Sequence, residues 1–160
     1  MNQPALAIQA FSRLASGFCA WCESDSLGAR GETHAAVWLA KLHAAALELP
    51  EIDGDDGNEM PVIPALQLQA AARNLAAFNG WYYRTVFDPS PTLDEEPVMG
   101  DVGDDLMDTY KDIKVGSLLA AENRIEEAIW QWSFTHQIHW GKHAVGALAA
   151  LQAFATQSSG

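Results

Sequence analysis

The C-terminal third of the chain carries histidines at a spacing suited to metal binding. His136, His139 and His143 follow one another at intervals of three and four residues, so they share one face if the segment is helical. His139 and His143 have the i, i+4 separation of two histidine ligands to one ion. The glutamate of the zinc-protease motif is absent, because Trp140 follows His139. The rest of this stripe is apolar, which favours the alternative: buried histidines hydrogen-bonded to aspartates or backbone carbonyls.

A series of aspartates is the second group of chemically capable residues. Asp101, Asp104, Asp105, Asp108 and Asp112 fall within an arc of about 100° if the segment is helical. The apolar residues of the same segment lie on the opposite side, which favours a solvent-exposed acidic face. The alternative is that Asp104, Asp108 and Asp112, each one turn apart, offer carboxylate oxygens to a divalent cation.

The two groups together suggest a cluster of aspartates and histidines between two helices. Its metal ligands would be Asp104, Asp108, His139 and His143, and the cofactor would be a divalent metal ion. A metal with an open position could activate water to hydrolyse a phosphorylated small molecule. However, the acidic face opposes the apolar face of its own helix, so only a flank can turn inward. This geometry favours a carboxylate–histidine network over a full metal cluster.

Five helices are expected to position these residues in an all-α, single-domain bundle covering residues 1–160. Apolar periodicity, glycines and prolines place them at about 3–24, 32–49, 64–78, 102–121 and 122–155. The last helix is expected to bend at Gly141 or Gly146. The two long connections, 51–64 and 88–97, are acidic loops. Residues 81–88 have β-like composition but no evident partner, so they are interpreted as an extended segment or the end of the third helix.

Composition excludes several classes of protein. The chain has 160 residues, 49% of them apolar, and a formal net charge of −12. Such a charge repels phosphate backbones and anionic lipids, so neither nucleic acid nor a membrane is an expected partner. Two cysteines do not make a disulfide framework, which favours the cytoplasm. Cys19 and Cys22 are interpreted as core residues within a helix rather than as a redox pair.

Two smaller features carry no expected chemistry. The acidic stretch 53–59 lacks the ligand pattern of a calcium loop. His34 and His43 are expected to be isolated residues at the surface or its rim. Fourteen of the 21 acidic residues fall in 51–59 and 88–112, so a basic partner or a cation is expected to bind there.

Several motifs resemble an uncharacterised bacterial family, domain-of-unknown-function family 5063. They are GDDLMDTYKDIK at 103–114, WQWSF at 130–134 and HWGKH at 139–143, with further similarity at 18–21, 42–50 and 83–89. The resemblance implies an all-helical bundle with no assigned activity. The residues matching the family's motifs form the candidate functional cluster: Asp104, Asp105, Asp108, Tyr110, Asp112, Trp132, His139, Trp140 and His143.

Two functions follow from these observations. The first is an interaction or accessory module that binds a basic protein or self-associates. The alternative is a metal-dependent hydrolase that uses the cluster between the fourth and fifth helices. The sequence favours the module, because buried polar networks are more often structural than catalytic, and it leaves open whether the protein is an enzyme.

Overall fold

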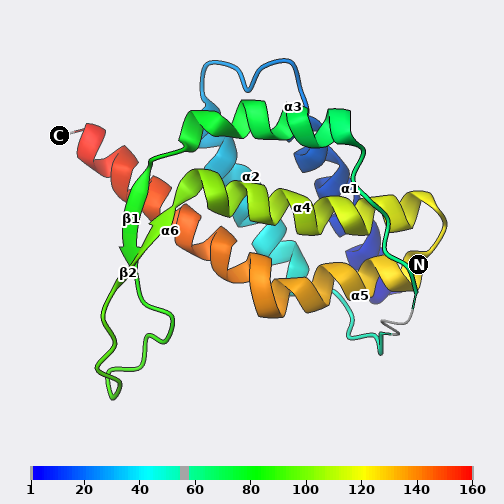
Figure 1. Cartoon of the computed structure of the whole chain (residues 1–160). Helices are drawn as coiled ribbons and strands as arrows, with labels where there is room; N and C mark the ends of the chain where they lie inside the picture. The colour runs from blue at the N-terminus through cyan, green and yellow to red at the C-terminus, as the bar shows by residue number, and fades with distance from the viewer. Residues whose placement is uncertain (1, 55–57, 160) are drawn as a thin grey trace.

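The computed structural model describes residues 2–54 and 58–159, which form a helical bundle with one small β-hairpin (Figure 1). The elements are α1 (Gln3–Cys22), α2 (Gly31–Ala46), α3 (Ala65–Leu75), β1 (Tyr82–Thr85), β2 (Val98–Asp101), α4 (Val102–Ala121), α5 (Ile125–Thr135) and α6 (Gly141–Ser158). The expected mostly helical fold is confirmed. No helix in the part of the chain described here is long and apolar enough to cross a membrane.

Local signals in the sequence account for the helix ends. The side chain of Asn2 accepts a hydrogen bond from the Ala5 amide and caps α1. Asp101 does the same for α4, accepting from the Gly103 amide at 2.8 Å. After α4, Asn123 adopts a left-handed conformation with φ of 62°, which turns the chain sharply into α5. The expected loop 51–64 is irregular wherever it is described, while Asp55 and Asp56 of its acidic stretch lie outside the described residues.

Helix α4 lies at the centre of the bundle and packs against α1, α3, α5 and α6, while α2 packs against α1 and α6. The aromatic part of the core joins α1 to the C-terminal helices, with Phe11 packed against Trp132 and Trp140. All three side chains are essentially buried. The apolar face of α4 is therefore covered, and its acidic residues must lie at the flanks or on the outer side.

The structure corrects the interpretation of residues 81–88. Tyr82–Thr85 pairs with Val98–Asp101 as an antiparallel hairpin, with Tyr83 opposite Gly100. The partner strand lies on the far side of the 86–97 connection, so neighbouring residues gave no sign of it. The hairpin projects from the end of the bundle where α4 begins (Figure 1).

The long C-terminal pattern is one helical run interrupted by a π-helical segment, His136–Trp140, which separates α5 from α6. This segment ends immediately before Gly141, one of the two positions where a bend is expected. A Cβ atom at Gly141 would lie 2.2 Å from the His136 carbonyl oxygen, so the wider turn requires glycine there. Such π-helical turns occur frequently at functional sites, and this one contains His139.

Candidate metal centre

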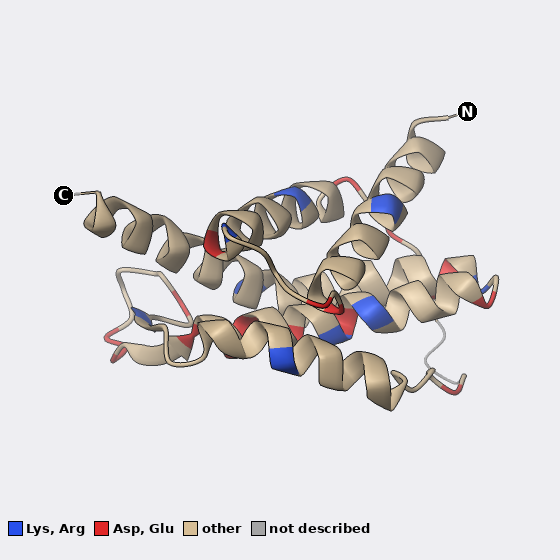
Figure 2. Cartoon of the chain, turned by 90° about the horizontal axis from the view of Figure 1, so that it is seen from above, with Lys and Arg blue, Asp and Glu red and all other residues tan. Residues whose placement is uncertain are grey.

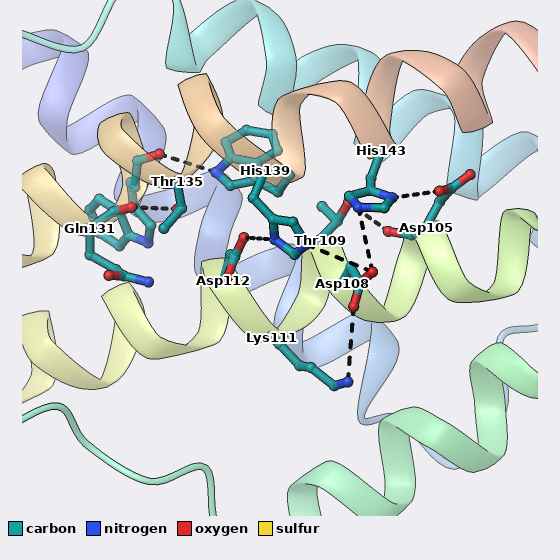
Figure 3. A network of polar contacts seen from close by, with 11 residues as sticks. Asp105, Asp108, Thr109, Lys111, Asp112, Gln131, Thr135, His139 and His143 are labelled. Atoms are coloured by element: carbon teal, nitrogen blue, oxygen red, sulfur yellow. Dashed lines mark hydrogen bonds and ion pairs between the residues drawn. The ribbon is translucent and has the colours of Figure 1, made fainter. Parts of the chain in front are cut away.

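Helix α4 and the C-terminal helical run bring three aspartates and two histidines together (Figure 3). We call Asp105, Asp108, Asp112, His139 and His143 the Asp/His cluster. Nδ1 of His139 lies 2.6 Å from Oδ2 of Asp112, and Nδ1 of His143 lies 2.7 Å from Oδ1 of Asp105. An ionised carboxylate only accepts hydrogen bonds, so each imidazole is assigned a hydrogen on Nδ1, and in the neutral ring Nε2 is left to accept a hydrogen bond or to bind a cation.

Both Nε2 atoms face the same oxygen. Oδ2 of Asp108 lies 3.9 Å from Nε2 of His139 and 3.5 Å from Nε2 of His143. Asp108, His139 and His143 each offer one ligand atom, all within 4.8 Å of one another. Tetrahedral zinc ligands at about 2.0–2.1 Å from the ion stand roughly 3.3 Å apart. Small side-chain rotations would therefore place these three atoms around one ion.

Burial differs between the two sides of the Asp/His cluster. The Asp105 side chain is only 6% exposed and that of Asp112 18%. The side chains of His139, Asp108 and His143 are 43%, 33% and 31% exposed. The hydrogen bonds that orient the imidazoles are thus shielded, whereas the side carrying the free nitrogens is open to solvent. An ion held by these residues would keep positions for water or another ligand.

The pKa values reflect this arrangement. The carboxylate of Asp105, hydrogen-bonded to the ring, raises the pKa of His143 above its ordinary value, against the opposing effect of burial. Burial raises the pKa of Asp112, and this desolvation outweighs the hydrogen bond with His139. Both shifts favour the protonated forms of these two groups, so a cation that binds here must displace a proton before it meets the full charge of the carboxylates.

The other candidate residues lie outside the Asp/His cluster. Asp104 is exposed, on the outer edge of α4. The Tyr110 hydroxyl donates to Glu23, the residue that follows α1, at 2.7 Å. Trp132 and Trp140 are buried, and their indole N–H groups donate to the carbonyls of Ile113 and Trp132, respectively. These three aromatic residues therefore hold the helices together around the site rather than lining it.

The third histidine of the stripe, His136, has a different partner. Its Nε2 lies 3.0 Å from Nδ1 of His43 on α2, so the expectation that His43 is isolated was wrong. Burial, reinforced by the neighbouring His43, lowers the pKa of His136 to about 4. The His136 ring is therefore neutral at pH 7, and its hydrogen bond with His43 joins the π-helical segment to α2.

Sequence reasoning missed one residue of the site, Tyr83. Its hydroxyl donates to Oδ2 of Asp105 at 2.5 Å, the carboxylate whose other oxygen binds His143. Its ring is half-buried while that of the adjacent Tyr82 is exposed, the alternation of a β-strand. Recognising 81–88 as a strand would have directed Tyr83 inward.

Comparisons with known proteins agree with the helical fold. A crystal structure of protein BF1032 from Bacteroides fragilis, a structural genomics target, superimposes with a TM-score of 0.69 at 18% sequence identity, covering 92% of this chain and 94% of that one. No curated protein matches the chain. The family described as "Domain of unknown function (DUF5063)" matches residues 3–157. The chain therefore belongs to the DUF5063 family.

Proposed function

We propose that this protein is a metal-binding accessory module, in which Asp108, His139 and His143 hold a divalent cation. One observation carries the proposal: both imidazoles donate Nδ1–H to a carboxylate while both Nε2 atoms face Oδ2 of Asp108. Metal-binding histidines almost always have such a carboxylate or carbonyl behind them, because it fixes the tautomer and makes the ligand nitrogen more basic. Asp105 and Asp112 take this supporting role, and Asp104 takes none.

The donor set favours a transition metal or zinc. Two imidazole nitrogens and one carboxylate oxygen suit zinc, manganese or iron, whereas magnesium and calcium prefer oxygen ligands alone. We expect zinc to bind most tightly of Zn²⁺, Mn²⁺ and Mg²⁺, following the general affinity order of nitrogen-containing sites.

We place binding ahead of hydrolysis on electrostatic and geometric grounds. The carboxylates of Asp105, Asp108 and Asp112 would repel the phosphate of an approaching substrate. A groove of about 780 Å³, the size of a small-molecule site, lies between α2, β1 and α6, and no residue of the Asp/His cluster lines it. The open side of the cluster is better suited to a metal shared with a partner's ligand or with water.

Adding zinc to the metal-free protein is expected to raise its melting temperature. At a free zinc concentration of 100 Kd, binding to the folded state contributes about 2.7 kcal/mol, equivalent to roughly 5–10 °C for a chain of this length. Differential scanning fluorimetry with Zn²⁺, Mn²⁺ and Mg²⁺ measures the shift, and calorimetric titration measures stoichiometry. The exposed His34 supplies the control, since His34→Ala removes a surface imidazole and should leave the shift unchanged. Absence of a shift with all three metals would overturn the proposal and leave a structural Asp–His network.

We further propose that the module acts in the cytoplasm and that its partner is a basic protein rather than a second copy of the chain. Two copies would each carry a net charge of −12 and repel one another. Acidic residues follow one another along the 86–97 connection of the hairpin (Figure 2), and Asp94 and Glu96 are exposed. Phe87 and Leu93 of the same connection are 66% and 54% exposed. This mixture of acid and apolar surface suits an amphipathic basic segment.

Neutralising the hairpin connection should weaken binding of a lysine-rich amphipathic peptide. We expect Asp94→Asn/Glu96→Gln to reduce affinity several-fold, and the loss to shrink at high salt because the contacts are electrostatic. Fluorescence anisotropy measures both. Asp25→Asn/Glu48→Gln makes the same charge change at exposed sites elsewhere and should have little effect. Equal losses in the two variants would mean that only net charge matters, which would contradict a site on the hairpin.

A further inference from the structure

Tyr83 occupies a slot that only glycines leave open. A Cβ atom built at Gly100 of β2 would lie 2.4 Å from Cζ of Tyr83. A Cβ atom at Gly146 of α6 would lie 2.5 Å from the Tyr83 hydroxyl oxygen. Contacts this short mean that a side chain at either glycine would force Tyr83 to move. Two glycines from different elements thus allow the ring to pass between the hairpin and α6.

At the end of this slot, the Tyr83 hydroxyl contacts the buried side of the Asp/His cluster, at Asp105. It donates to Oδ2 of Asp105, while Oδ1 of the same carboxylate accepts from Nδ1 of His143. One carboxylate therefore joins residues from β1, α4 and α6. Since the carboxylate of Asp105 is almost fully buried, losing one of its two partners would leave it poorly satisfied and free to rotate.

We propose that Tyr83 is a positioning residue of the metal site, through which docking of the hairpin on the bundle controls the metal affinity. With the hydroxyl in place, Asp105 is held in the rotamer that orients His143 and directs Nε2 of that ring toward Asp108. When the hairpin moves away, Asp105 and then His143 lose this orientation. The metal-dependent part of this inference rests on the proposed function, whereas the effect of Tyr83 on His143 does not.

The two histidines of the site provide an internal comparison. His139 is oriented by Asp112 of α4 (Figure 3), and among the described residues no hydrogen bond joins either side chain to the hairpin. A disturbance passing through Tyr83 should therefore reach His143 and spare His139. General destabilisation of the bundle would affect both rings.

The test combines Tyr83→Phe with two measurements. Zinc affinity by calorimetry is expected to fall several-fold, less than the roughly 10–100-fold for loss of a group bonded directly to a metal ligand, because Tyr83 acts through Asp105. Imidazole ¹⁵N chemical shifts of the metal-free protein at alkaline pH report the tautomer of each neutral ring. We expect His143 to change from mainly Nδ1–H to a mixture, with His139 unchanged. Tyr82→Phe, which alters the exposed neighbouring tyrosine of the same strand, should change neither measurement.

Gly146→Ala tests the same mechanism without touching a hydrogen-bonding group. The new methyl group should displace the Tyr83 hydroxyl and reproduce the loss of affinity, although alanine is the better helix former. Removing the hydroxyl relieves this clash, because the next ring atom lies 3.4 Å from the added Cβ. The double variant Tyr83→Phe/Gly146→Ala should therefore bind zinc no more weakly than Tyr83→Phe alone.

The outcomes separate the two proposals. If the wild-type protein binds zinc and the tautomer of His143 is the same in Tyr83→Phe, positioning by Tyr83 is wrong and the metal site stands. If the wild-type protein binds no zinc, the metal site is wrong, and the tautomer measurement still decides whether Tyr83 orients His143. Additive losses in the double variant would also overturn the mechanism, because they would show independent effects.

Discussion

Replacing Asp108 by asparagine is expected to abolish tight zinc binding while leaving the protein folded. Oδ2 of Asp108 is the oxygen that both Nε2 atoms face, so the substitution removes one of three ligands and one of three negative charges. The loss of zinc affinity should exceed about 100-fold, the largest loss typical for a residue that only hydrogen-bonds to a metal ligand. Calorimetric titration measures the affinity, and the thermal unfolding curve of the metal-free variant reports the fold. Because the substitution relieves repulsion between carboxylates, the melting temperature of the metal-free variant should stay unchanged or rise slightly.

Asp104→Asn is the matched control for this substitution. Asp104 lies one turn earlier on α4 and is exposed, so the variant makes the same charge change on the same helix. We expect its zinc affinity to stay within about 2-fold of wild type, because a solvent-exposed charge is largely screened. Similar losses in both variants would indicate diffuse attraction to an acidic surface, and would contradict a site with defined ligands.

Replacing Trp132 by alanine is expected to cost about 3–5 kcal/mol of unfolding free energy, the typical cost of truncating a buried aromatic side chain. Trp132 is 1% exposed, packs against Phe11 with ring centroids 5.0 Å apart, and donates its indole N–H to the Ile113 carbonyl at 3.0 Å. A Cβ atom at Gly116 would lie 2.1 Å from that indole nitrogen, so α4 and α5 are in close contact here. Losing this contact should loosen the helix pair that carries the site.

Urea denaturation followed by circular dichroism measures the effect. Phe134→Ala is the comparison on the same helix, since Phe134 is 39% exposed, and it should cost less than about 1 kcal/mol. If Trp132→Ala does not fold, Trp132→Phe still tests the prediction: it keeps a ring, loses the indole hydrogen bond to the Ile113 carbonyl and leaves a small cavity, and should cost about 1–3 kcal/mol. A cost no greater than that of Phe134→Ala would mean that Trp132 does not hold α5 on α4.

Much of the helical framework could be predicted from neighbouring residues. Apolar periodicity and a glycine before the first turn placed α4 at about 102–121, the range that the structure has. Prolines at both ends predicted the 51–64 connection, because proline restricts its own backbone and that of the preceding residue. The hairpin was not predicted, because β-pairing depends on a partner that is distant in sequence. Tyr83 and Gly100 are 17 positions apart and pair across the two strands, and this pairing is visible only in the tertiary structure.

For the site, the sequence by itself determined the residue types and their spacing along each helix. Asp104 and Asp105 are about 100° apart on α4, so the sequence placed them at opposite edges of the acidic arc. Helical periodicity alone does not show which of these edges faces another helix. The packing of α6 on α4 turned Asp105 inward and Asp104 outward, and paired Asp105 with His143 across 38 positions. The π-helical turn at His136–Trp140 likewise rotated His136 toward His43 and left His139 with Asp112. These pairings were decided by tertiary structure alone, because they depend on how helices are rotated against one another.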